Sequence, residues 1–176
     1  MINKSCPSKL YRLITIYMKI NVPVKILICL LGFLSVGAVI GGGALMVSPY
    51  GNLLQMPVSM LGSSPFNNYL IPGFILFFFL GIIPGLLVFA LIRKPEYRIC
   101  EALNLFNDMH WAWTFSIYVA IALIIWIQVE MIMLNIVMWL QTFYMGFAIV
   151  MILITLLPQV RNEYHACLAC HSNYFF

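Results

Sequence analysis

The chain has 176 residues, of which 64% are hydrophobic and only 8% are charged. This composition excludes an ordinary soluble domain, because too few charges remain to solvate its surface. The net charge of +4 does not indicate nucleic-acid binding, because the basic residues flank long apolar stretches instead of forming one patch. We therefore expect an all-α, polytopic membrane four-helix bundle in a single domain, with the lipid bilayer as its main partner.

Residues 8–20 precede the first apolar stretch and carry basic side chains at Lys9, Arg12 and Lys19. This spacing places a basic stripe on an otherwise apolar helix, which predicts an interfacial helix on the inner membrane surface. The alternative is a tail whose charges only set the orientation of the protein.

The first two predicted spans cover residues 26–47 and 70–92, and no residue from Ile26 to Ile92 carries a formal charge. The first apolar run is longer than the roughly 7–15 residues of a signal-peptide core. We therefore expect the first span to be retained in the protein and not cleaved.

Small residues recur at helical spacing in both of these spans. Gly37 and Gly41 lie four residues apart, and Gly81 and Gly85 repeat this spacing around Pro84. Small residues at this spacing allow helix backbones to approach closely in a membrane. They predict helix packing within one bundle, and an interface in a homo-oligomer is the alternative.

The connection between these spans, residues 48–69, is uncharged and largely apolar. Its first residues, Ser48 to Asn52, have the composition of a turn. A loop of this kind is not expected to be a solvated connector. It is expected to lie in the outer headgroup region or to fold over the bundle as a lid.

The run GGGALMVSP, followed by PVSMLGSSPFNNYLIPGFILFFFLG, covers roughly residues 41–81. It resembles a signature of small four-span integral membrane proteins of bacteria. The resemblance implies a bacterial inner-membrane protein, and it implies no activity.

The apolar region 111–157 is too long for one span and is interrupted by Gln128, Glu130 and Asn135. We predict a tight outer hairpin there, between spans at residues 111–129 and 134–157. At such a turn a glutamate reaches water at little cost.

Residues 158–176 are predicted to form a cytoplasmic tail. Its sequence Cys167-Leu168-Ala169-Cys170-His171 matches the pattern for c-type haem attachment, but the inner side of the membrane is the wrong context for haem. His165, Cys167, Cys170 and His171 are candidate zinc or copper ligands. A second ligand pair at zinc-finger spacing is missing, so we expect no metal and no cofactor.

The orientation follows from the charges. With the N-terminus inside, all nine Lys and Arg residues lie on the inner side, which predicts an N-in/C-in topology. Trp111 and Trp113 then lie at the inner interface, and Tyr69 and Trp126 lie toward the outer one.

No catalytic motif stands out, so the first hypothesis is a non-enzymatic scaffold or accessory subunit. The rival is a small-solute transporter or channel that uses Gln128, Glu130, Asn135 and Gln141. A third hypothesis is a membrane-embedded lipid-modifying enzyme using Glu130 or His110, although His110 is expected to be solvated or to face headgroups. Polar groups that converge on one inward pocket would favour the second or third hypothesis over the first.

The topology can be tested with reporters. A reporter that is active only in the cytoplasm should be active when fused after Phe176 and silent when inserted after Asn52, because these sites lie on opposite sides of the membrane. Activity in the reverse pattern would contradict the predicted orientation.

Overall fold

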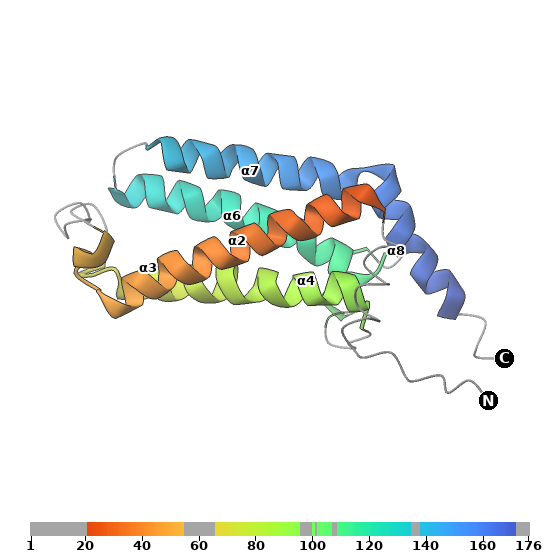
Figure 1. The fold of residues 1–176 in the computed structure, drawn as a ribbon, viewed down its shortest axis with the longest axis horizontal. Coiled ribbons are helices and arrows are strands. Elements are labelled where there is room, and N and C mark those ends of the chain that lie inside the picture. The colour runs from red at the N-terminus through yellow and green to blue at the C-terminus, as the bar shows by residue number, and fades with distance from the viewer. Residues whose placement is uncertain are drawn as a thin grey trace, which may run out of the picture.

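Figure 1 shows a bundle of long helices in the computed structural model. The structure describes residues 21–54, 66–95, 100, 102–106, 109–134 and 138–171, and for residues 165–171 it describes the backbone alone. The described part of the chain is all-helical, as predicted. The predicted interfacial helix at residues 8–20 lies outside the described residues.

Among the described residues, four helical segments are long and apolar enough to cross a membrane, which confirms the predicted count of spans. The first span is α2, Val22–Val47, and the second, Leu70–Arg93, joins α3 (Leu70–Ile75), the π-helix η3 (Leu76–Ile82) and α4 (Ile83–Arg93). The third and fourth are α6 (Trp111–Leu134) and α7 (Trp139–Leu156), and α8 (Pro158–His171) follows them.

Apolar side chains lie on both the inside and the outside of this bundle. On α2, Leu27 and Leu31 are fully buried, whereas Val36 and Ile40 are 60% and 67% exposed. A helix that is apolar all round needs an apolar medium on its outer face. A bilayer provides that medium, and it requires each span to satisfy its own backbone hydrogen bonds, as helices do.

The first two spans approach each other through glycine. A Cβ atom added to Gly42 would lie 2.7 Å from the backbone nitrogen of Phe77, and one added to Gly73 would lie 2.7 Å from Cβ of Leu45. Further along the same contact, a Cβ on Gly81 would lie 2.9 Å from Val39. These distances leave no room for a side chain, so the glycines set the spacing of α2 and the second span.

The four glycines that were predicted to pack helices differ in how closely a neighbouring helix approaches them. Gly81 and Gly85 face α2, where a Cβ on Gly85 would lie 2.8 Å from Oγ of Ser35. Gly37 faces the hydroxyl of Tyr144 on α7, at 3.2 Å from an added Cβ. At Gly41 the nearest atom is a side-chain carbon at 3.8 Å, so Gly41 is not at the tightest contact.

The second span changes its helical form around Pro84. The backbone nitrogen of Ile83 donates to the carbonyl of Phe78, five residues earlier, which is the π-helical pattern. Proline has no N–H to donate to the carbonyl four residues before it, so the preceding turns widen. Ser35 of α2 then donates its hydroxyl to the carbonyl oxygen of Gly81 at 2.7 Å.

The hairpin between the last two spans begins later than predicted. Helix α6 continues through Gln128 and Glu130 to Leu134, so the prediction of a turn at Glu130 was wrong. The sequence VEMIML after Gln128 has no glycine or proline to stop a helix. Residues 135–137, which include Asn135, lie outside the described residues.

The outer loop begins with the predicted turn. The nitrogen of Gly51 donates to the carbonyl of Ser48 at 2.9 Å, and Gly51 has a φ of 75°, a left-handed conformation that favours glycine. After the short helix η1 (Asn52–Leu54), the chain returns to Tyr69, whose nitrogen donates to the carbonyl of Pro49 at 2.9 Å. Residues 55–65 of this connection, which was predicted to lie in the headgroup region or to form a lid, are outside the described residues.

The glycine contact leads to a paired test. Gly42→Ala should lower the free energy of unfolding by about 1–3 kcal/mol, because the new methyl group meets the backbone of Phe77. Gly32→Ala in the same helix should be neutral or slightly stabilising, since an added Cβ meets nothing within 4 Å there. Unfolding followed in mild detergent measures both variants, and equal effects would contradict the assigned packing.

Candidate functional site

Two adjacent cavities lie between the spans, one of about 160 Å³ and the other of about 200 Å³. They are formed by α2, the first half of the second span, α6 and α7. Both cavities are lined by Gly41, Leu76, Trp126, Glu130, Leu140 and Gln141. Because these residues are shared, the two cavities form one continuous candidate site.

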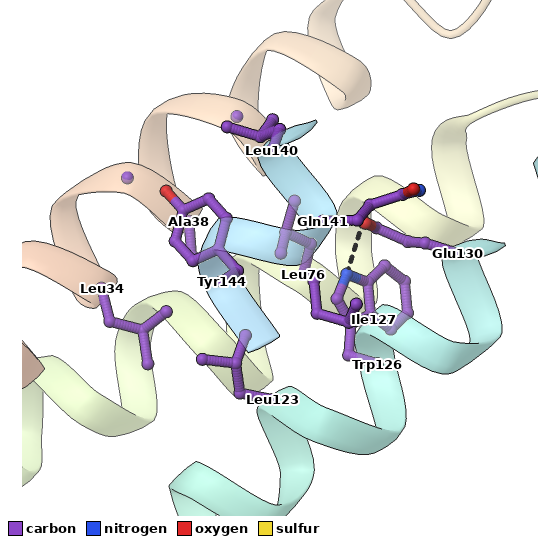
Figure 2. Close-up of a pocket in the computed structure, with 12 residues that line it drawn as sticks. Leu34, Ala38, Leu76, Leu123, Trp126, Ile127, Glu130, Leu140, Gln141 and Tyr144 are labelled. Carbon is purple, nitrogen blue, oxygen red and sulfur yellow. Dashed lines mark hydrogen bonds between the residues drawn. The ribbon is translucent and has the colours of Figure 1, made fainter. Parts of the chain in front are cut away.

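Glu130 supplies the only formal charge among the described residues that line the site. Its Oε1 accepts a hydrogen bond from the indole nitrogen of Trp126, one helical turn earlier, at 2.7 Å (Figure 2). Within the described part of the chain, this indole is the one hydrogen-bond donor to Glu130. The carboxylate therefore has hydrogen-bonding capacity left for a ligand.

Helix α7 contributes the other polar groups of the site. Gln141 is only 4% exposed, and its Oε1 accepts a hydrogen bond from the backbone nitrogen of Met138 at 2.9 Å, which caps the start of α7. Tyr144, one turn further along, lines the smaller cavity. Figure 2 shows Glu130, Gln141 and Tyr144 around the same space.

The structure brings together two of the four residues predicted for a polar membrane site. Glu130 and Gln141 line both cavities. Gln128 is exposed on the outside of α6, and Asn135 lies outside the described residues. The convergence of the first two, from different helices, is what distinguishes a binding pocket from scattered polar groups.

Trp126 is a site residue that the sequence reasoning did not assign to the site. It was expected toward the outer interface, and the structure adds that it is 9% exposed and hydrogen-bonded to Glu130. The available signal was the spacing of four residues between Trp126 and Glu130, which brings two side chains together on a helix. Tyr144 was also missed, because one tyrosine in an apolar span carries no signal of its own.

His110 was predicted to face solvent or headgroups, and this prediction was wrong, because the residue is only 3% exposed. Its Nδ1 accepts a hydrogen bond from the backbone nitrogen of Ala112 at 3.2 Å, at the start of α6. Its ring lies 5.5 Å from that of Trp111 and 6.3 Å from that of Tyr164. The aromatic surroundings shield it from water, and the contact with Ala112 satisfies a free donor at the helix start.

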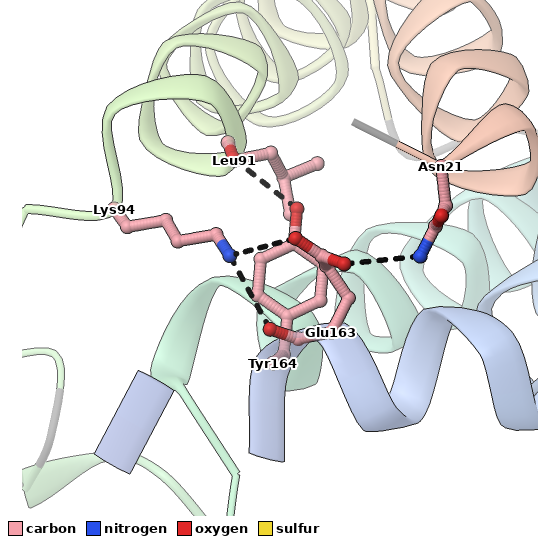
Figure 3. Close-up of polar contacts among 5 residues, drawn as sticks. All are labelled: Asn21, Leu91, Lys94, Glu163 and Tyr164. Atoms are coloured by element: carbon pink, nitrogen blue, oxygen red, sulfur yellow. Dashed lines mark hydrogen bonds and ion pairs between the residues drawn. The ribbon is translucent and has the colours of Figure 1, made fainter. Parts of the chain in front are cut away.

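A second polar cluster joins helix ends that lie together at one end of the bundle (Figure 3). Lys94 pairs with Glu163 of α8 at 3.3 Å, and Asn21 donates to the other carboxylate oxygen at 3.0 Å. The hydroxyl of Tyr164 donates to the carbonyl of Leu91 at 3.2 Å. These contacts connect the start of α2, the end of α4 and α8, so they hold the helix ends in place.

Lys94 ends α4 in a strained conformation that these contacts support. Its φ of 47° and ψ of 52° are left-handed, which costs a non-glycine residue roughly 1–2 kcal/mol. Its ammonium group lies 4.9 Å from the centre of the Tyr164 ring. Together with the Glu163 pair, this ring contact fixes the side chain and assigns Lys94 a structural role.

The candidate metal ligands His165, Cys167, Cys170 and His171 lie in α8, but their side chains are outside what the structure describes. Among the described side chains, no group of three or more possible ligands comes together. The described cysteines, Cys29 and Cys100, are not joined in a disulfide.

No protein-family model, curated protein or solved structure matches this chain. The four apolar helices define its class, which is a multi-pass integral membrane protein.

Proposed function

We propose that this membrane protein binds a small solute in the cavities around Glu130, as a small-solute transporter or channel does. The observation that carries the proposal is the convergence of Glu130 and Gln141, from α6 and α7, on the same two adjoining cavities. An ionisable side chain at membrane depth is costly, and it commonly marks the path of an ion or substrate.

The two acidic residues that the structure describes, Glu130 and Glu163, contrast in a way that supports this role. Glu163 has a lysine and an asparagine as partners at the helix ends, which is how a structural carboxylate is stabilised. Glu130 has one neutral donor, and none of the described basic residues lines its cavities. The cavity beside an uncompensated carboxylate offers space for the compensating ligand.

The other two hypotheses receive less support. Of the four glycines that motivated a scaffold or oligomer, Gly37, Gly81 and Gly85 are occupied by contacts with neighbouring spans of the same chain. An enzyme would need further reactive groups, but the described lining has no second carboxylate and no histidine, serine or cysteine. The lining therefore favours binding over chemistry.

We also propose a location in a bacterial inner membrane with both termini inside. The described basic residues that flank the spans, Lys25, Arg93, Lys94 and Arg161, belong to the helix ends that the Glu163 contacts bring together. Positive charge at one end of a bundle favours the cytoplasmic side. Glu130, near the far end of α6, then lies in the outer half of the membrane (Figure 1).

A cavity-filling variant tests solute binding. An added Cβ at Gly41 has its nearest neighbour at 3.8 Å, so Gly41→Phe should place its ring in the shared cavity without a backbone clash. Protein in lipid nanodiscs is equilibrated with a bacterial metabolite extract, and retained solutes are identified by native mass spectrometry. We expect Gly41→Phe to retain at least roughly tenfold less of the bound solute.

Gly146→Phe on the outer face of α7 is the matched control, because an added Cβ there meets nothing within 4 Å. It should retain the same solutes as the wild type. Glu130→Gln, which preserves the shape of the side chain, serves as a second test if Gly41→Phe unfolds in detergent. Identical retained solutes in all variants, or none in the wild type, would contradict the proposed function.

A further inference from the structure

We infer that the solute is an organic cation with an apolar body, whose positive charge is held between the Glu130 carboxylate and the Trp126 indole. This inference rests on the proposed function and adds the chemical class of the ligand to it. The charge, the aromatic groups and the aliphatic walls of the site each favour a ligand of this class.

The charge of the site selects a cation. Glu130 is the one formally charged residue in the described lining, and the hydrogen bond from Trp126 does not neutralise it. An anionic ligand would be repelled by the carboxylate in a medium that screens charges poorly. A cationic ligand would instead form a charge-assisted contact and remove the cost of an unpaired carboxylate.

The aromatic groups strengthen this preference. Trp126 lines both cavities and lies directly beside the carboxylate (Figure 2). Tyr144 adds an aromatic ring to the smaller cavity and Tyr69 adds one to the larger. Indole attracts cations most strongly among the aromatic side chains, and the attraction grows when water is excluded.

The remaining walls select an organic ion over an inorganic one. Calcium takes 6–8 oxygen ligands and magnesium needs a nearly octahedral set, but the described lining offers one carboxylate, one amide and two tyrosine hydroxyls. The walls are otherwise aliphatic, and in the smaller cavity they are formed by Leu34, Ala38, Leu76, Leu123, Ile127 and Leu140. Apolar walls around a single charge fit an ion that carries its own apolar groups and binds little water.

The volume of the site limits the size of this ion. The smaller cavity holds about 160 Å³ and the larger about 200 Å³. A quaternary ammonium with one aromatic ring is of this size, and it cannot donate a hydrogen bond or lose a proton. The comparison of this ion with a neutral molecule of the same shape therefore reports the recognition of charge, without a contribution from hydrogen bonding or proton loss.

A matched pair of probes tests the inference. Benzyltrimethylammonium is compared with neopentylbenzene, which has the same shape but carbon in place of the charged nitrogen. Binding to the full chain in detergent is measured by calorimetry, with protein-free micelles as the blank. We expect the cation to bind at least about tenfold more tightly than its neutral isostere.

Variants locate the source of this preference. Glu130→Gln should strongly reduce the preference for the cation, because it removes the negative charge, and Trp126→Phe should reduce it further, because a benzene ring attracts cations less strongly than indole. Glu163→Gln removes the same charge at the far end of the bundle and should leave the preference unchanged. Thermal unfolding of each variant verifies that the bundle is intact.

The possible failures are distinguishable. Equal binding of both probes to the wild type, or a cation preference that is undiminished in Glu130→Gln, would overturn the inference and leave the proposed solute pocket standing. Binding of neither probe would overturn the inference and would also count against the pocket itself.

Discussion

The contact between Gly42 of α2 and the backbone at Phe77 is the constraint on which the rest of the bundle depends. In a membrane, lipid is as apolar as a leucine side chain, so helices gain little by burying such side chains and associate through close packing. The absence of a side chain at Gly42 and at Gly73 lets two backbones touch. This contact fixes one pair of spans, and α6 and α7 pack against that pair.

The cavities are a consequence of the same contact. Gly41 precedes Gly42 but points about 100° away from it around the helix, toward α6 and α7. There the spans are separated by leucine, tryptophan and tyrosine side chains, which hold the helices further apart than glycine does. The small surface of Gly37, Ala38 and Gly41 is left without a close partner over part of its length. One face of α2 thus forms the tightest contact of the bundle, and the adjacent face borders its open space.

The π-helix in the second span contributes to the site through its position. Pro84 removes a backbone donor, and the widened turns before it include Leu76, which lines both cavities. Ser35 reaches across from α2 to the carbonyl of Gly81, so a backbone acceptor close to the disturbed turn has a partner. Irregular backbone in a membrane persists where neighbouring helices satisfy it, and this irregularity lies at the tightly packed interface.

The sequence was sufficient to predict the four spans, because apolar runs bounded by charge or by turn residues are a strong signal. It was insufficient for the hairpin, since Gln128 and Glu130 looked like the polar centre of a turn although nothing in that segment stops a helix. Glycine spacing predicted close helix packing within the bundle without saying which spans meet, and the closest approach of the first two spans falls at Gly42 and not at Gly41. Hydropathy cannot resolve such details, because residues facing the core and residues facing lipid are equally apolar.

The sequence also could not predict which polar side chains are buried. Gln128 and Glu130 are two residues apart in one helix, yet the first is exposed and the second borders the cavities. His110 and Lys94 both lie near helix ends, but His110 accepts from the backbone N–H of Ala112, and Lys94 contacts the Tyr164 ring and the carbonyl of Glu163, which gives both residues structural roles. Glu130 differs from both, because its side chain retains hydrogen-bonding capacity beside open space. A bundle selected only for stability would gain by replacing such a carboxylate with an apolar side chain of similar size, and this cost is the physical reason for proposing that Glu130 has a ligand.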